Sequence, residues 1–198
     1  IHHSTTGDLD RRSVGDVWTM TIKEYEASSW LMRALYRFVR NPWILFTFSP
    51  IALFFIWQRF STKRASMKDR LSVLRTNIGI AAMIAAGCSI LGWEKYLILQ
   101  FSVSCVTNTV GVWLFYVQHQ FEDVYWARNE EWNFAAAALE GSSFYKLPKV
   151  LQWFSGNIGF HHIHHLSSRI PNYRLEECHN SEPIFQEVPP MTLRSSLA

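Results

Sequence analysis

Four histidines lie within five residues in the C-terminal part of the chain, where residues 156–165 read GNIGFHHIHH. Taken as an H-x-x-H-H motif, the run contains His161, His164 and His165. On a helix these positions share one face, because residues three and four apart are neighbours. His162 lies one residue round the turn and is expected to point away. Imidazoles gathered on one face suit iron, copper or zinc, so the motif predicts a metal site.

Two further histidine groups are candidates for the same site. His2 and His3 are adjacent and precede the polar run S-T-T-G-D. His119 follows a long apolar stretch, and an ionisable residue at a membrane boundary is a functional candidate. The alternative is an interfacial residue at headgroup level. A metal-bound imidazole usually needs a hydrogen-bond partner for its second nitrogen. The partners proposed from the sequence are Asn157, Glu176 and Glu177.

The composition favours a membrane protein. Of 198 residues, 48% are apolar, 15% aromatic and 18% charged, whereas soluble domains carry about 25% charged residues. Such hydrophobicity argues against disorder, and a net charge of +3 is too small to indicate a nucleic-acid partner. Three cysteines argue against a disulfide framework. The chain opens at Ile1 within a motif, and we expect residues 1–198 to be one domain truncated at its N-terminus.

Two uncharged stretches predict a transmembrane helical hairpin over residues 76–121. Residues 76–93 and 96–121 each have the length that a membrane span needs, about 17–25 residues. Only Glu94 and Lys95 separate them, which predicts a tight turn.

A third uncharged stretch, residues 41–58, has the same length but is expected not to cross. Basic residues lie on both of its flanks, and basic flanks favour the cytoplasmic side. Pro42 and Pro50 bend or break helices. We therefore expect a membrane-associated segment, the alternative being a simple third span.

This topology places all three histidine groups on the cytoplasmic side of the membrane. Residues 122–198 contain no further span and are expected to form a cytoplasmic cap. Helices are expected at 17–39, 129–139 and 148–165, and an irregular tail after Ile170. The expected fold class is all-α: an integral membrane protein with a transmembrane hairpin and a histidine-rich cap.

Four segments resemble the bacterial acyl-lipid desaturases, omega-6 or delta-12-like, of the membrane fatty acid desaturase family. They are residues 2–12 (HHSTTGDLDRR), 15–19 (GDVWT), 115–123 (FYVQHQFED) and 156–165. Members of that family hold two irons with three histidine boxes and one additional histidine, on the cytoplasmic side of the membrane.

The resemblance implies a ligand set. His2 and His3 would end the second box, His161, His164 and His165 would form the third box, and His119 would be the additional ligand. The first box and the first histidine of the second box are absent from this sequence. The chain alone is therefore expected to be inactive.

The resemblance also implies a reaction and its partners. The enzyme would use O2 to place a cis double bond in a fatty acyl chain of a membrane lipid, with electrons from ferredoxin or a cytochrome b5-type protein. It would lie in the cytoplasmic membrane of a bacterium as a multi-pass protein. Trp113, Phe115 and Tyr116 are candidates to line the substrate tunnel, ordinary packing being the alternative. Basic residues that could face an acidic electron donor, rather than solvent alone, are Arg11, Arg12, Lys146 and Lys149.

Two other functions fit the histidine pattern. A related di-iron hydroxylase would insert oxygen and retain it in the product. A histidine-rich metal transporter or sensor is the non-enzymatic alternative. Transporters place their ligands near the middle of the membrane, whereas the histidines here lie at span ends or outside the spans, which favours an enzyme.

Overall fold

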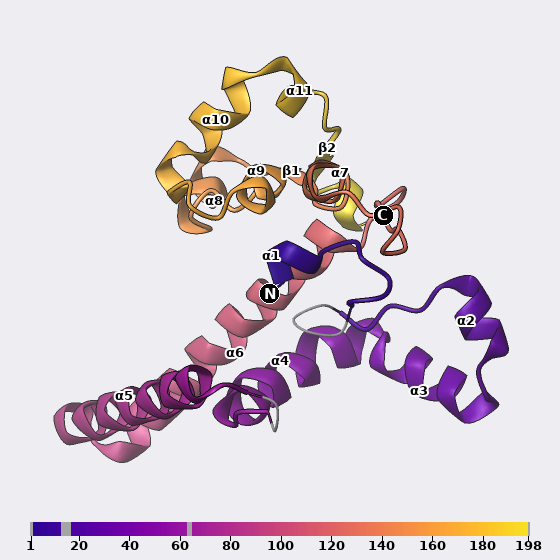
Figure 1. Cartoon of the computed structure of the whole chain (residues 1–198). Helices are drawn as coiled ribbons and strands as arrows, with labels where there is room; N and C mark the ends of the chain where they lie inside the picture. Colours follow the sequence, from indigo (N-terminus) through magenta and orange to yellow (C-terminus); the bar gives the residue numbers. More distant parts are fainter. Residues whose placement is uncertain (1, 13–16, 63–64, 198) are drawn as a thin grey trace. The chain divides into compact units, whose positions relative to one another are not determined.

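The structure, a computed structural model, describes residues 2–12, 17–62 and 65–197 and is mostly helical (Figure 1). The contacts divide the chain into two compact units. The histidine unit comprises residues 1–26 and 114–198, and the hairpin unit comprises residues 27–113. Gly15 and Asp16, which belong to one of the resemblance segments, lie outside the described residues.

The hairpin unit contains the two longest helices. Its elements are α3 (Trp30–Val39), η1 (Ile44–Phe48), α4 (Ser49–Ile51), η2 (Ala52–Ile56), η3 (Trp57–Arg59), α5 (Met67–Leu91) and most of α6 (Trp93–His119).

Helices α5 and α6 are both long and apolar enough to cross a membrane. A capping box begins α5, because Ser66 and Asp69 each bond the other's backbone N–H. At the turn, Gly92 takes a φ of 83° that a side chain would strain. One turn earlier, Gly87 leaves room for the ring of Tyr96. The helix predicted from residue 76 begins earlier, at Met67. The turn predicted at Glu94 and Lys95 lies instead at Gly92, because both residues belong to the first turns of α6.

Residues 44–59 form a chain of short helical turns rather than one regular helix. Their axis is bent by 58° from that of α3. Helix α3 and residues 44–59 therefore form a third candidate span only if the bent pair is counted as one broken helix. Pro50 lies in the first turn of α4, where its missing N–H is tolerated.

The continuous helix predicted over residues 17–39 is wrong. The structure has two helices, α2 (Ile22–Ala27) and α3, with a break between them. The hydroxyl of Ser29 accepts a hydrogen bond from Met32 N, which starts a new helix at Trp30. The apolar side chains of α3 are exposed, with Trp30 at 74% and Phe38 at 60%.

The histidine unit is an assembly of short helices around two strands. Its elements are α1 (His2–Thr5), α2, the end of α6, α7 (Phe134–Leu139), β1 (Phe144–Lys146), α8 (Lys149–Phe154), α9 (His161–Leu166), η4 (Asn172–Arg174), α10 (Leu175–Ser181), α11 (Pro183–Gln186), β2 (Pro190–Thr192) and η5 (Ser195–Leu197).

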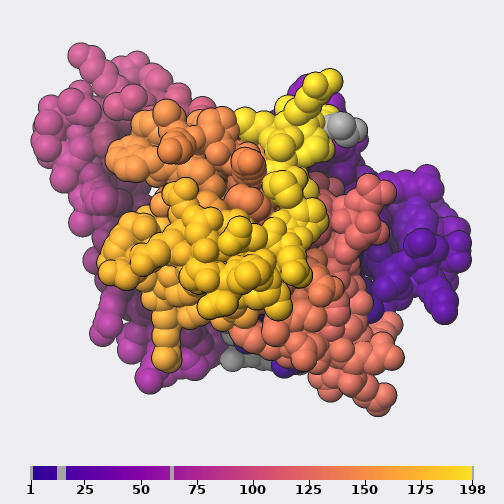
Figure 2. Space-filling view, turned by 90° about the horizontal axis from the view of Figure 1, so that it is seen from above, coloured from indigo at the N-terminus to yellow at the C-terminus, as the bar shows by residue number. Residues whose placement is uncertain are grey.

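Two findings correct the sequence predictions for this unit. The fold is not purely helical, because β1 pairs with β2 in parallel, Tyr145 facing Met191. The segment after Ile170 is not irregular, since it forms α10, α11 and β2. Leu175 and His179, one helical turn apart on α10, are both buried and hold that helix on the core. Figure 2 shows the surface that this segment forms, in yellow.

The core of the histidine unit is formed by α9, the residue before it and the start of α10. Phe160, Ile163 and Leu175 are buried together, and four partly buried residues pack on them: Phe144, Ile170, Cys178 and Phe185. Gly159 lets the backbone before α9 approach β1, because a side chain there would clash with Tyr145 O and Gln152. Tyr145 N donates to Gly159 O at 2.7 Å. The start of α9 is therefore fixed against β1.

Candidate metal centre

Three segments of the histidine unit bring six histidines together. Helix α1 contributes His2 and His3, the last residue of α6 is His119, and α9 contributes the three residues of the H-x-x-H-H motif. Nε2 of His119 lies 2.8 Å from Nε2 of His161 and 3.2 Å from Nε2 of His2. Residues about 40 and 120 positions apart in the sequence thus meet at one point.

The remaining histidines continue the same cluster. The ring of His3 lies 4.5 Å from that of His164 and 4.8 Å from that of His165, measured between centroids. The ring of His165 also lies 4.7 Å from that of His119. His119, His161 and His165 are buried, at 5%, 5% and 2% exposure, and His2, His3 and His164 are partly buried, so one side of the cluster is shielded from water.

The donor atoms fit a metal ion. One nitrogen from each of His2, His119, His161 and His165 lies within 4.8 Å of the others. Two nitrogens on one ion, each about 2.1 Å from it, lie at most about 4.2 Å apart, so only small shifts are needed. Nε2 of His165 is buried and has no hydrogen-bond partner among the described residues. Buried polar atoms are normally partnered, and a bound metal would supply what this atom lacks.

Two hydrogen bonds fix which ring nitrogen faces the cluster. The hydroxyl of Thr6 donates to His2 O at 2.9 Å, so it accepts from Nδ1 of His165, 3.3 Å away. Nδ1 of His119 donates to Gly141 O at 3.2 Å. Both rings therefore carry their proton on Nδ1 and leave the lone pair of Nε2 free for a metal.

Burial keeps the imidazoles neutral. It lowers the pKa of His3 to about 4, with a smaller contribution from the charge of His164. Burial also lowers the pKa of His161, His164 and His165, and neighbouring histidines add to the effect. Metal binding requires deprotonated ligands, and at neutral pH these rings meet that condition.

The segment after α1 is tied to residues 125–132, which fixes the position of His2 and His3. Leu9 N donates to Ala127 O at 2.9 Å, and Ala127 N donates to Gly7 O at 2.9 Å. The indole of Trp132 donates to Thr6 O at 2.9 Å. Gly7 takes a φ of 73° and lies against Tyr125 O, so a side chain there would displace the segment.

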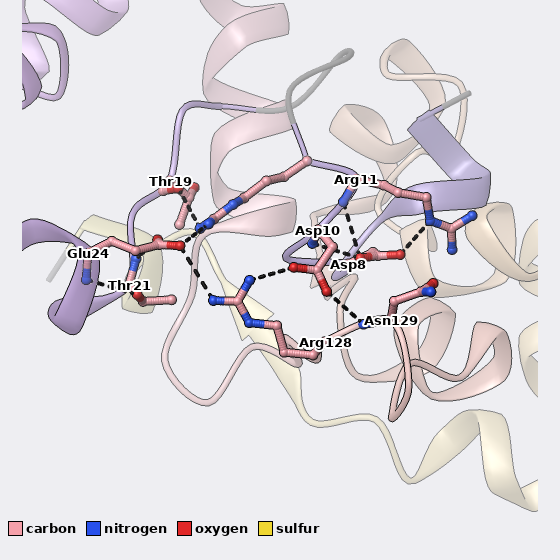
Figure 3. A network of polar contacts seen from close by, with 9 residues as sticks. Asp8, Asp10, Arg11, Thr19, Thr21, Glu24, Arg128 and Asn129 are labelled. Atoms are coloured by element: carbon pink, nitrogen blue, oxygen red, sulfur yellow. Dashed lines mark hydrogen bonds and ion pairs between the residues drawn. The ribbon is translucent and has the colours of Figure 1, made fainter.

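A network of ion pairs extends this attachment (Figure 3). Arg128 bonds Asp10, which also accepts from Asn129 N at 3.0 Å. Arg128 also reaches Glu24 at 3.6 Å. The network ties the segment after the first histidines to the loop after α6 and to α2.

Arg11 and Arg12 have partners within the unit. Arg11 Nε lies 2.5 Å from the buried carboxylate of Asp8, and Arg12 bonds Glu24. Both arginines are therefore in ion pairs within the unit, with the side chain of Arg11 47% exposed, and the suggestion that they face an electron donor stays a prediction. Lys146 and Lys149 flank the short segment between β1 and α8 and do not take part in this network.

The three hydrogen-bond partners proposed from the sequence lie elsewhere. Asn157 donates to Asn172 O at 3.1 Å, and Glu177 is 3.6 Å from Arg174 and 71% exposed. Glu176 is exposed. The partners that the histidines do have, Thr6 and Gly141 O, were not predicted. Thr6 lies three residues after His3, in the polar run that follows the His-His pair, and this position was a usable signal. A backbone carbonyl leaves no signal in the sequence.

The three tunnel candidates are placed differently. Phe115 packs against the rings of His2 and His119, with both centroid distances 5.0 Å. Tyr116 lines an open cleft of about 840 Å³ beside the end of α6, in the histidine unit. Trp113 belongs to the hairpin unit and packs on Phe46 at 5.3 Å. Of the three, the described contacts bring Phe115 against the histidine rings.

Comparison with known proteins gives one consistent family. The family model described as "Fatty acid desaturase" matches residues 1–194. A "Fatty acid desaturase" of Bacillus subtilis is 49% identical over 197 residues, which cover all of this chain and 56% of that protein. An "sn-1 oleoyl-lipid 12-desaturase" of Synechocystis is 24% identical, covering 91% of this chain and 51% of that protein.

The name of a third relative includes the word ferredoxin. The "sn-2 acyl-lipid omega-3 desaturase (ferredoxin), chloroplastic" of Helianthus annuus is 25% identical over 89% of this chain and 41% of its own length. The chain spans about half the length of these relatives. No solved structure matches the chain.

Proposed function

The chain belongs to the fatty acid desaturase family, and we propose that it is the histidine-bearing part of a membrane enzyme that introduces a cis double bond into the acyl chain of a membrane lipid. One observation carries the proposal: six histidines from three distant segments meet in one cluster, three of them buried and three partly buried. A family relationship predicts a desaturase, and the cluster supplies a place where its metal could bind.

The six histidines would supply part of the ligands of a pair of irons. A bound iron pair would use O2 to oxidise an unactivated methylene, whose strong C–H bond gives no acidic proton for a side chain to remove. Thr6 and Gly141 O would keep His165 and His119 in the tautomers that present Nε2. The burial of the rings would exclude bulk water, which protects a reactive site from side reactions.

Phe115 would form an apolar wall beside the histidines. Its ring touches His2 and His119 and comes from the last turns of α6. An acyl chain next to that ring would lie close to the metal ligands without meeting a polar side chain. The position of an acyl chain along such a wall decides which methylene reacts.

We further propose that α5 and α6 cross the membrane as a hairpin with the histidine unit on the cytoplasmic side. Two helices of sufficient length and the basic flanks of residues 41–58 support this topology. Ferredoxin is the favoured electron donor, since one relative is named for it. A cytochrome b5-type protein is the second candidate.

The test is lipid analysis of a bacterial host that lacks its own desaturase and expresses the full gene product carrying this chain. Gas chromatography with mass spectrometry of fatty acid methyl esters should show new cis-unsaturated acids. His164→Ala should abolish them with the protein still in the membrane, whereas Asn180→Ala, an exposed position on α10, should not. Hydroxy acids in place of unsaturated acids would contradict desaturation and indicate hydroxylation.

A further inference from the structure

Two buried histidines lie outside the cluster and form a pair of their own. Nε2 of His162, on α9, is 3.0 Å from Nδ1 of His179, on α10. Exposure is 0% for His162 and 7% for His179. Among the described residues, the ring of His162 packs on Phe144 and His179 and not on any histidine of the cluster.

The side chains packed on this pair are aromatic, and the backbone of Phe185 also lies within reach of both imidazoles. The ring of His179 lies 4.5 Å from that of Phe144 and 5.2 Å from that of Phe160, and these two phenylalanines stack at 5.1 Å. A polar pair buried in such a core adds little stability compared with apolar residues of similar size. Apolar residues would also fill the space, so a role other than packing accounts better for two imidazoles here.

Helix α9 is short and must hold its ligands at a fixed rotation. It has six residues, too few to be stable alone. One residue corresponds to about 100° of rotation, since a turn takes about 3.6 residues. A modest rotation of α9 would therefore swing His161 and His165 away from His119. A directional hydrogen bond from the reverse face resists such rotation, whereas an apolar contact does so only weakly.

We propose that His179 is a positioning residue, which fixes the rotation of α9 through its hydrogen bond to His162 and so aims the α9 histidines at the metal. The proposal rests on the proposed function, because it assumes that the cluster binds iron. His179 touches neither metal nor substrate and acts only through α9.

The test compares metal binding with folding in the full protein. The variants are His179→Leu, which fills the space without a hydrogen bond, and His179→Asn, whose amide can replace Nδ1. Fe(II) is titrated anaerobically and Co(II) is followed by its visible spectrum. Thermal unfolding is measured in metal-free protein.

The expected result is that the double variant His162→Leu/His179→Leu, which leaves no imidazole unpaired, melts without metal at or above the temperature of the wild type, yet binds Fe(II) about 10–100-fold more weakly. The Co(II) spectrum should change, and His179→Asn should restore both affinity and spectrum. His179→Leu should bind Fe(II) as weakly as the double variant does, and it should melt lower than the double variant because it leaves His162 unpaired.

Three results would overturn the proposal. Wild-type affinity in both leucine variants would remove the positioning role. An affinity loss in the leucine variants that only follows a loss of folded metal-free protein would assign the pair to packing. Failure of the wild type to bind Fe(II) or Co(II) at all would overturn the proposed metal centre together with this inference.

Discussion

The hydroxyl of Thr6 offers the sharpest test of how the metal ligands are oriented. Thr6→Val keeps the shape of the side chain and removes the group that accepts from Nδ1 of His165. Thr6 is 5% exposed, so water does not readily replace the hydroxyl. The carbonyl of His2 keeps a partner, because it still accepts from Thr6 N at 3.0 Å. Among the residues that the structure describes, the group left without its partner in the variant is Nδ1–H of His165.

The size of the effect follows from that single orphan. A buried donor without a partner costs about 1–3 kcal/mol. His165 can avoid the cost by moving its proton to Nε2, but this places a proton on the nitrogen that the structure leaves free for metal. The penalty therefore appears as weaker metal binding, about 10–100-fold, which corresponds to about 1.4–2.7 kcal/mol.

The assay is anaerobic Fe(II) titration of the full protein, with Thr6→Ser as the matched control. Serine keeps the hydroxyl and loses only a methyl group, so it should bind Fe(II) nearly as the wild type does. Equal affinity in the valine and serine variants would refute the argument that Thr6 sets the tautomer of His165.

Three further predictions concern stability and substrate access. Hydrogen bonding from Arg12 lowers the pKa of Glu24 from 4.5 to about 2. This pair therefore stabilises the fold fully above pH 4.5, and the stabilisation is lost as the pH falls towards 2. Melting temperatures of wild type and Glu24→Gln should differ at pH 7 and converge near pH 2. Gly159→Ala should destabilise the protein by about 1–3 kcal/mol in chemical denaturation, because its methyl group meets a strand carbonyl. Gly79→Ala, in the interior of α5 with no atom nearby, is its control and should not destabilise the protein, because alanine favours a helix over glycine. Phe115→Ala should leave the iron content of the purified protein unchanged and lower the yield of unsaturated acids at least about tenfold, because the substrate is positioned less well. Loss of iron in this variant would show that Phe115 supports the metal ligands instead.

The sequence predicted best what depends on local spacing. The H-x-x-H-H motif lies on a short helix, α9, and the apolar stretches correspond to the long helices α5 and α6. Residues 41–58 were expected to be bent, and the structure has a bend of 58° between α3 and residues 44–59. Membrane insertion and the ligand role of each histidine remain predictions.

Features that depend on tertiary contacts were missed. The strand β1 pairs with β2, which lies more than 40 residues later in the chain. Each strand has only three residues, too few to show the alternation that predicts a strand. The pairing of His162 with His179 depends on how α10 packs against α9. Ser29, a favoured helix-capping residue, indicated the break before α3. The prediction missed it because the apolar periodicity continues on both sides of Ser29.

The most direct test of the account is the iron content of the purified full gene product. Measured by mass spectrometry against protein concentration, it should approach two irons per chain in the wild type and fall strongly in His161→Ala and His165→Ala, with both variants still folded. Iron content that is unchanged in these two variants would contradict the claim that the buried histidine cluster holds the metal.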